Sequence, residues 1–175
     1  QKVRLSTGRV VSARVILVAT GGAPVMYPAI PGAELAISSN EIFDLKHFPQ
    51  RLMVVGGGYI AVEFASVFAR LGSQVTQVFR ADNVLRGFDG DLRATLAEAM
   101  GHAGIALKPG LLPTRIERAS GALRVSLSDG SSADVDQVLV ATGRAPCTAG
   151  LGLEAAGVGL RQNGAYDVTG IARKP

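Results

Sequence analysis

A glycine-rich turn carries the clearest chemistry in this sequence. Gly56, Gly58 and Ala61 form the pattern Gly-x-Gly-x-x-Ala directly after an apolar run at residues 51–55. Gly56 permits a tight strand-to-helix turn, Gly58 lets a pyrophosphate approach the backbone, and Ala61 lets the helix pack closely on the sheet. The N–H groups at the start of that helix attract phosphate. The order of strand, motif, helix and second strand favours this interpretation over a glycine turn that binds nothing.

Two arginines follow the second strand, which is expected at residues 73–79. NAD sites usually have an acidic residue at the end of this strand, where it binds the ribose hydroxyls. Here the strand ends Val78-Phe79-Arg80, and Arg86 lies six residues further on. Two guanidinium groups would bind a 2′-phosphate through charge-assisted hydrogen bonds. The alternative is a pair of ordinary surface arginines, but the missing acid favours NADP(H).

The elements that position these residues alternate as in an α/β protein. Apolar residues at helical spacing predict a helix over residues 59–71, which Gly72 ends. The remaining elements are expected as a helix at 89–100 capped by Asp89 or Asp91, a strand at 105–107, antiparallel strands at 115–117 and 123–127, and a strand at 137–142. The predicted fold is a Rossmann-like NAD(P)-binding α/β domain with a parallel sheet and an antiparallel β-meander.

An internal repeat divides the chain. Residues 3–24 and 125–146 align at an offset of 122 with 11 identities in 22 positions, and both end in Ala-Thr-Gly-x-Ala-Pro. Each copy predicts two short strands around a turn and then a buried apolar strand. Two generic hairpins are the alternative; we interpret the copies as the ends of two related domains. The predicted parts are residues 1–49, the end of an earlier domain with a connector, residues 50–146, the nucleotide-binding domain, and residues 147–175, a return into the earlier domain.

The connector at residues 23–50 contains four proline residues. It contains Pro24, Pro28, Pro31 and Pro49. Its middle, residues 38–43, predicts a short capped helix.

Composition narrows the function classes. The chain has 175 residues, of which 47% are hydrophobic and 18% charged, so it can build a substantial core. It has no apolar run of about 18 residues that would predict a membrane span. A net charge of +4 without a basic block argues against nucleic-acid binding. The chain has one cysteine, Cys147, so it can form no internal disulfide, which is consistent with the reducing cytoplasm. One cysteine and two histidines are too few for a typical structural zinc site, so no metal site is predicted.

Three motifs in combination resemble the pyridine-nucleotide disulfide oxidoreductases. They are Gly-Gly-Gly-Tyr-Ile-Ala-Val-Glu-Phe-Ala at 56–65, Val-Leu-Arg-Gly-Phe-Asp at 84–89 and Ala-Thr-Gly-Arg-Ala-Pro at 141–146. The resemblance runs over nearly the whole chain and is greatest to the glutathione reductases, although trypanothione reductases share much of it. It implies a flavoprotein that passes hydride from NADPH to FAD, after which the electrons reduce an active-site disulfide and finally glutathione disulfide. The earlier domain would then bind FAD. Another disulfide reductase and a non-catalytic NADP-binding module are the alternatives.

The resemblance also implies roles for ten cofactor-binding residues. Gly56, Gly57 and Gly58 would hold the pyrophosphate, Tyr59 would cover the nicotinamide pocket, Ile60 would contact the nucleotide, Glu63 would face the nicotinamide, Arg80 and Arg86 would bind the 2′-phosphate, and Gly143 and Arg144 would line the far wall. Three of these residues also have a simpler interpretation. Tyr59 could only cover the first turn of the helix, Glu63 could be a solvent-exposed helical acid, and Arg144 could be a charged residue of a surface loop.

The family's other functional parts have no counterpart in this sequence. The resemblance implies that the redox cysteine pair, the FAD-binding motif and the acid/base pair lie outside residues 1–175, so no catalytic residue is expected here. The chain is expected to bind NADP(H), to turn nothing over and to be largely monomeric. The parent enzyme is expected to be a cytoplasmic homodimer that acts on glutathione disulfide.

Overall fold

The chain forms two compact units. The structure, a computed structural model, describes residues 2–26 and 30–166; Pro28 of the connector and the end of the predicted return segment lie outside these residues. The larger unit is Pro24–Arg144, and the smaller one combines Gln1–Ala23 with Ala145–Pro175. The larger unit thus takes in the connector as well as the glycine turn. The domain boundaries proposed from the repeat stay predictions.

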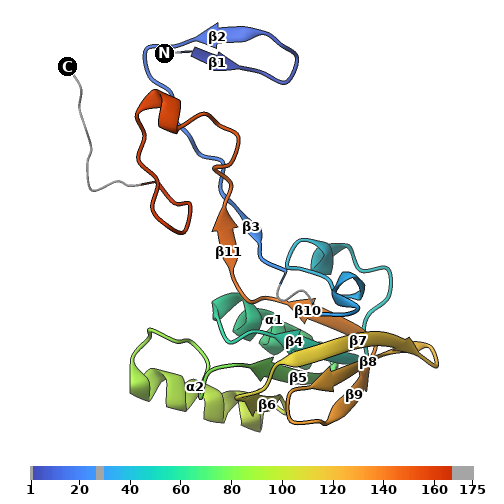
Figure 1. The fold of residues 1–175 in the computed structure, drawn as a ribbon. Helices are drawn as coiled ribbons and strands as arrows, with labels where there is room; N and C mark the ends of the chain where they lie inside the picture. The colour runs from blue at the N-terminus through green and yellow to red at the C-terminus, as the bar shows by residue number, and fades with distance from the viewer. Residues whose placement is uncertain (1, 27–29, 167–175) are drawn as a thin grey trace. The chain divides into compact units, whose positions relative to one another are not determined.

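The larger unit is built on a parallel sheet of order β10-β4-β5-β6 (Figure 1). Its strands are β4 (Arg51–Val55), β5 (Gln74–Phe79), β6 (Ala106–Pro109) and β10 (Gln137–Val140). Two helices make the crossovers: α1 (Tyr59–Arg70) joins β4 to β5, and α2 (Gly90–His102) joins β5 to β6. This strand–helix–strand order with parallel neighbours is Rossmann-like and confirms the predicted fold class.

An antiparallel meander follows the parallel strands. It consists of β7 (Pro113–Ala119), β8 (Ala122–Leu127) and β9 (Ser132–Val135). Ser120 and Gly121 form the tight turn between β7 and β8, and both have positive φ, 47° and 82°. Such a turn matches the twist of the paired strands. The meander confirms the second part of the predicted fold, although β7 extends beyond the expected 115–117.

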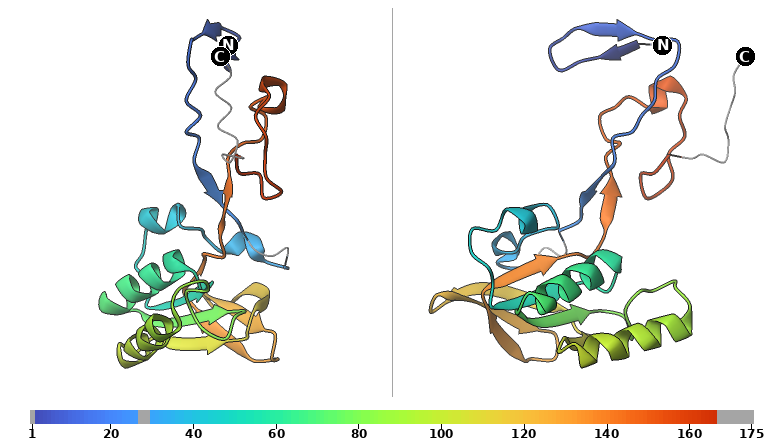
Figure 2. Two further views of the ribbon diagram at one scale, coloured as in Figure 1. Left: turned by 90° about the vertical axis from the view of Figure 1, so that its left-hand side faces the viewer. Right: turned by 180° about the vertical axis from the view of Figure 1, so that it is seen from behind.

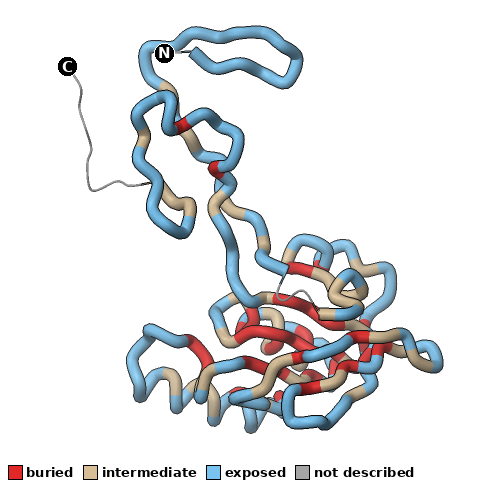
Figure 3. Tube along the Cα trace, viewed as in Figure 1, coloured by how far each residue is buried: buried red, intermediate tan, exposed pale blue. Residues whose placement is uncertain are grey.

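The parallel sheet is buried on both faces. On β4, Leu52 and Val54 belong to one apolar cluster with side chains of α1, whereas Met53 and Val55 belong to a second cluster with side chains of the meander. All four are fully buried. The helices therefore cover one face and the meander the other, in three layers (Figures 2 and 3).

The connector covers the outer edge of β10. It contains two short 3₁₀ helices, η1 (Ala33–Leu35) and η2 (Glu41–Asp44). The Ile37 N–H donates to Val138 O at 2.9 Å, and the Val140 N–H donates to Ile37 O at 2.8 Å. This isolated bridge at Ile37 and Leu139 covers part of the outer edge of β10. The predicted short helix at 38–43 is confirmed as η2.

Two hydrogen bonds from backbone N–H groups to side chains hold the chain at the start of η2. The Ser38 N–H donates to Glu41 Oε2 at 2.8 Å, and the Asn40 N–H donates to Ser38 Oγ at 3.1 Å. Hydrogen bonds from Ser38 hold the pKa of the Glu41 carboxyl below its ordinary value. Only half of a capping box is present, because Glu41 accepts from the Ser38 N–H while Ser38 Oγ accepts from the N–H of Asn40 and not of Glu41.

The smaller unit holds a hairpin, β1 (Lys2–Arg4) with β2 (Val10–Ser12), and a short helix, η3 (Glu154–Ala156). The buried strand predicted for residues 15–18 is wrong in this structure, because Val15 and Leu17 are 77% and 87% exposed. Their counterparts at the offset of 122 form β10, which pairs with β4 and the connector. Residues 15–18 pair with no strand among the described residues, so the same pattern stays uncovered.

The last three residues of each repeat copy pair with each other. They are β3 (Gly22–Pro24) and β11 (Arg144–Pro146), which form a two-stranded sheet.

Within residues 2–26 and 30–166, no helix has the length and apolar character that a membrane span requires.

Candidate functional site

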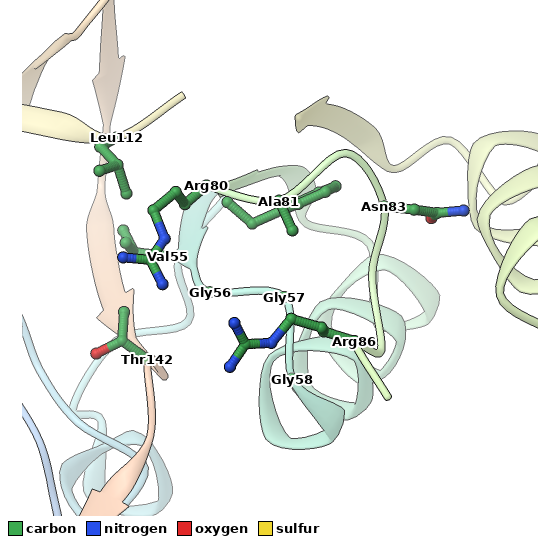
Figure 4. Close-up of a pocket in the computed structure, with 11 residues that line it drawn as sticks. Val55, Gly56, Gly57, Gly58, Arg80, Ala81, Asn83, Arg86, Leu112 and Thr142 are labelled. Atoms are coloured by element: carbon green, nitrogen blue, oxygen red, sulfur yellow. The ribbon is translucent and has the colours of Figure 1, made fainter. Parts of the chain in front are cut away.

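A cavity of about 360 Å³ opens where β4 and β5 end and where the chain leaves β10 (Figure 4). It is lined by Val55, Gly56, Gly57, Gly58, Phe79, Arg80, Ala81, Asn83, Arg86, Leu112 and Thr142. Ligands of open α/β sheets bind at this carboxyl edge of the strands. The cavity brings together five of the ten predicted site residues: Gly56, Gly57, Gly58, Arg80 and Arg86.

Gly56 is held between two strands of the sheet. Its φ is +135°, and a Cβ atom built there would lie 2.3 Å from Ala141 O, which follows β10. Its N–H donates to Val78 O at 2.8 Å, and its carbonyl accepts from Nε2 of the fully buried Gln77 at 2.9 Å. Both the backbone conformation and the available space therefore require glycine at this position.

Gly58 opens the site at the start of α1. It is the N-cap residue, with φ −81° and ψ 177°, and apart from Gly58 itself and its two chain neighbours nothing lies within 4 Å of where its Cβ would be. It offers no side chain to cap the helix, and the first turn of α1 contains no acidic residue. The first N–H groups of a helix have no intrahelical acceptor. They are therefore available to an anion in front of the glycine turn, residues 56–58.

Arg80 and Arg86 add two positive charges to the same space. Arg80 directly follows β5 and Arg86 lies before α2; both are exposed, and Figure 4 shows both guanidinium groups pointing toward the space in front of the glycine turn. Neither forms an ion pair or hydrogen bond with another described residue. Two unpaired like charges repel each other, and a bound anion would relieve that repulsion.

The loop between β5 and α2, residues 80–89, is tied to the glycine turn. The Leu85 N–H donates to Gly57 O at 2.7 Å. Leu85 has φ +53°, which is uncommon for a residue other than glycine, and its side chain is buried beside that of Val84. This contact joins the glycine turn to the loop that carries Arg86.

Five predicted residues do not line this cavity. Tyr59, Ile60 and Glu63 lie on the first two turns of α1; Tyr59 is 58% exposed, Ile60 half-buried and Glu63 exposed. Gly143 has φ +151°, and its carbonyl accepts from the Val25 N–H. Arg144 Nη1 lies 3.5 Å from Ser39 Oγ of the connector. The roles given to these five residues stay predictions.

Six lining residues were not singled out from the sequence. Val55, Phe79, Ala81 and Thr142 lie at or just after the ends of β4, β5 and β10, so the sheet order would have located them. Asn83 and Leu112 come from loops, where the sequence gives no signal. Among the described residues, no group of three or more His, Cys, Asp or Glu side chains is placed to bind a metal ion.

The family follows from comparison with known proteins. Residues 1–170 match the sequence model of the pyridine nucleotide-disulphide oxidoreductases. This chain belongs to that family. It is 50% identical to glutathione reductase from Burkholderia cepacia over 167 residues, which is 95% of this chain and 37% of that protein. It is 41% identical to trypanothione reductase from Leishmania donovani over 162 residues, which is 90% of this chain and 33% of that protein.

Solved structures agree with this assignment. The fold superposes with a TM-score of 0.86, at 33% identity, on the HOCl-induced flavoprotein disulfide reductase RclA from Escherichia coli. That match covers 95% of this chain and 39% of the other. The chain spans about a third of the length of the curated relatives that it matches.

Proposed function

We propose that the larger unit binds NADP(H). The glycine turn holds the pyrophosphate, and the guanidinium groups of Arg80 and Arg86 bind the 2′-phosphate. The unpaired state of these two arginines beside the glycine turn is the observation that supports this proposal. No acidic residue is among those that line the cavity, so the site lacks the carboxylate that NAD sites use for the ribose hydroxyls.

The nicotinamide half of the cofactor lies along the residues next to the cavity. Tyr59 covers the nicotinamide, Ile60 contacts the nucleotide, and Glu63 faces the ring from the next turn of α1. Gly143 and Arg144 line the opposite side. The position of Tyr59 and Glu63 supports this assignment, because both side chains are exposed on the first two turns of α1, after the glycine turn.

The parent protein is an NADPH-dependent flavoprotein disulfide reductase whose substrate is glutathione disulfide. Identities of 50% and 48% to two bacterial glutathione reductases support this substrate. When bound to the parent protein, FAD would supply the redox chemistry that connects NADPH to a redox disulfide. Cys147 is the single cysteine of this chain, so the chain supplies no dithiol and binds the nucleotide without turnover. The parent is a cytoplasmic homodimer, whereas this chain alone is monomeric.

Calorimetric titration of the chain with NADPH and with NADH tests the cofactor assignment. We expect much tighter binding of NADPH, and we expect the double variant Arg80→Ala/Arg86→Ala to lose that preference while it still binds NADH. Each charge-assisted hydrogen bond to the phosphate contributes about 1.5–3 kcal/mol. The matched control is Arg70→Ala/Arg118→Ala, which removes two exposed arginines outside the cavity lining.

Two results would contradict the assignment: equal affinity for NADPH and NADH in the unmodified chain, or no binding of either. The substrate assignment is tested separately on the parent protein, by comparing NADPH oxidation with glutathione disulfide and with trypanothione disulfide. Faster turnover with trypanothione disulfide would overturn it.

A further inference from the structure

A third arginine contacts the β5–α2 loop from the other side. Arg93, on the first turn of α2, donates from Nε to Val84 O at 2.7 Å and from Nη2 to Asn83 O at 3.3 Å. Nη2 also lies 3.2 Å from Asp82 Oδ1. The Arg93 side chain is only 20% exposed and does not line the cavity. Its donors therefore bind the loop and not a ligand.

The loop needs such a contact to keep its conformation. Leu85 has the strained left-handed backbone, and Arg86, Gly87 and Phe88 after it are all exposed. A strained backbone persists only where surrounding contacts over-determine it. Within the loop, the Phe88 N–H donates to Leu85 O at 3.0 Å and the Val84 N–H donates to Asn83 Oδ1 at 2.8 Å. Besides the burial of two side chains, the bonds that tie this part of the loop to other elements are the Leu85 N–H bond to Gly57 O on one side and the Arg93 bond to Val84 O on the other.

The three bonds of Arg93 differ in what they contribute. Asp82 is 90% exposed, so its ion pair with Arg93 is screened by water and contributes little. Val84 is fully buried, and the bond to its carbonyl is short and formed by a charged donor. Of the three bonds from Arg93, the one to Val84 O, two residues before Arg86, is thus the one that contributes most to holding the loop.

We propose that Arg93 is a positioning residue for recognition of the 2′-phosphate. It holds the backbone of Val84 and Leu85 against the glycine turn, which places the Arg86 guanidinium over the phosphate-binding end of the cavity. Without Arg93 the loop moves Arg86 away, while the glycine turn and Arg80 keep their places because β4 and β5 hold them. The inference rests on the proposed NADP(H) site and adds a residue that determines its selectivity.

The test uses the variant Arg93→Met, which keeps an apolar stem of similar length and removes the guanidinium. We expect its dissociation constant for NADPH to rise about tenfold, the effect of losing one charge-assisted hydrogen bond, and that for NADH to stay unchanged. Asp82→Asn is the matched control and should leave both constants unchanged. Arg93→Lys, which keeps the charge but cannot form the same bonds, should lie between the two and serves if Arg93→Met fails to fold.

A double-mutant cycle separates positioning from general stability. If Arg93 acts through Arg86, then Arg93→Met combined with Arg86→Ala weakens NADPH binding no more than Arg86→Ala alone. Additive losses, or equal losses of NADPH and NADH affinity, would overturn the inference. If the unmodified chain shows no NADPH preference, the proposed function itself fails. If it shows one that Arg86→Ala reduces and Arg93→Met does not, only the role of Arg93 fails.

Discussion

At the scale of single residues, positions 56 and 58 are both glycine, but for different reasons. Gly56 is enclosed by protein and has a backbone conformation that other residues avoid, whereas Gly58 has an ordinary backbone and empty space beside it. The first is required by the fold. The second is required only if something else occupies that space.

Alanine at each position distinguishes the two requirements. We expect Gly56→Ala to lower the free energy of unfolding by at least about 3 kcal/mol, because the new Cβ meets Ala141 O and the backbone is strained. Gly58→Ala should leave that free energy nearly unchanged and weaken NADPH and NADH binding to the same extent, because it fills the space where the pyrophosphate lies. Urea unfolding and calorimetry measure the two effects. Gly58→Ala with unchanged affinity would place the pyrophosphate elsewhere.

Some of these residues could be predicted from the sequence and others could not. The glycine turn and the two arginines have fixed spacing relative to the strands, so pattern alone located them. Gln77 lies in β5, and its amide Nε2 donates to the Gly56 carbonyl while its Oε1 has no partner among the described residues. Nothing in the sequence indicates either feature. Arg93 looks like any helical arginine, because its contacts depend on how α2 packs against the loop.

At the scale of elements, one ion pair links the meander to the parallel sheet. Asp136 lies between β9 and β10, and Arg51 begins β4. The Asp136 carboxylate accepts from the Arg51 backbone N–H at 2.8 Å and from Arg51 Nε at 3.1 Å, and the Asp136 N–H donates to Arg51 O at 2.9 Å. The hydrogen bond from the Arg51 side chain lowers the pKa of Asp136 from its ordinary 3.8 and raises the pKa of Arg51.

This pair predicts a pH-dependent contribution to stability. Because the folded pKa of Asp136 is below its unfolded value, the contribution is present above the unfolded pKa and is lost as the pH falls through the folded one. Asp136→Asn should therefore be less stable than the unmodified chain at pH 7, and the difference should shrink below about pH 4. Urea unfolding at pH 7 and pH 3 measures it. The control Asp44→Asn, at an exposed residue with no side-chain hydrogen bond among the described residues, should show no difference at either pH. A constant deficit for Asp136→Asn would contradict the assignment.

Element positions were predictable where the local pattern decides them. The expected strand at 51–55 and helix at 59–71 match β4 and α1 within one residue, because the short apolar run, the helical spacing and Gly72 mark their ends. Asp89, one of two expected caps, is the N-cap of α2 and accepts from the Asp91 and Leu92 N–H groups. The apolar residues at 15–18 have a strong strand pattern, but the strand predicted from it is absent. A buried strand needs neighbouring strands, which a local pattern does not reveal.

At the scale of the whole molecule, the two units differ in how much apolar surface they bury. Both apolar clusters lie within the larger unit. In the described part of the smaller unit, Leu153 and Thr148 are buried, whereas Val15, Leu17, Val10 and Leu160 are exposed. Burial of apolar surface is the dominant stabilising term in folding, so local stability should differ between the units.

Limited proteolysis with trypsin tests this difference. We expect early cleavage after Arg9 and Arg14 in the smaller unit, and slow cleavage after Arg51, Arg93 and Arg124, which begin or lie within elements packed on the apolar clusters. NADPH should slow the second set further and leave the first unchanged, because a ligand stabilises only the region whose folded state it binds. Mass spectrometry of the fragments gives the order of cleavage, and calorimetry on the trimmed product shows whether the nucleotide site persists. Cleavage at Arg51 or Arg124 as fast as at Arg9 would mean that the apolar clusters do not hold the larger unit together as an independent folding unit.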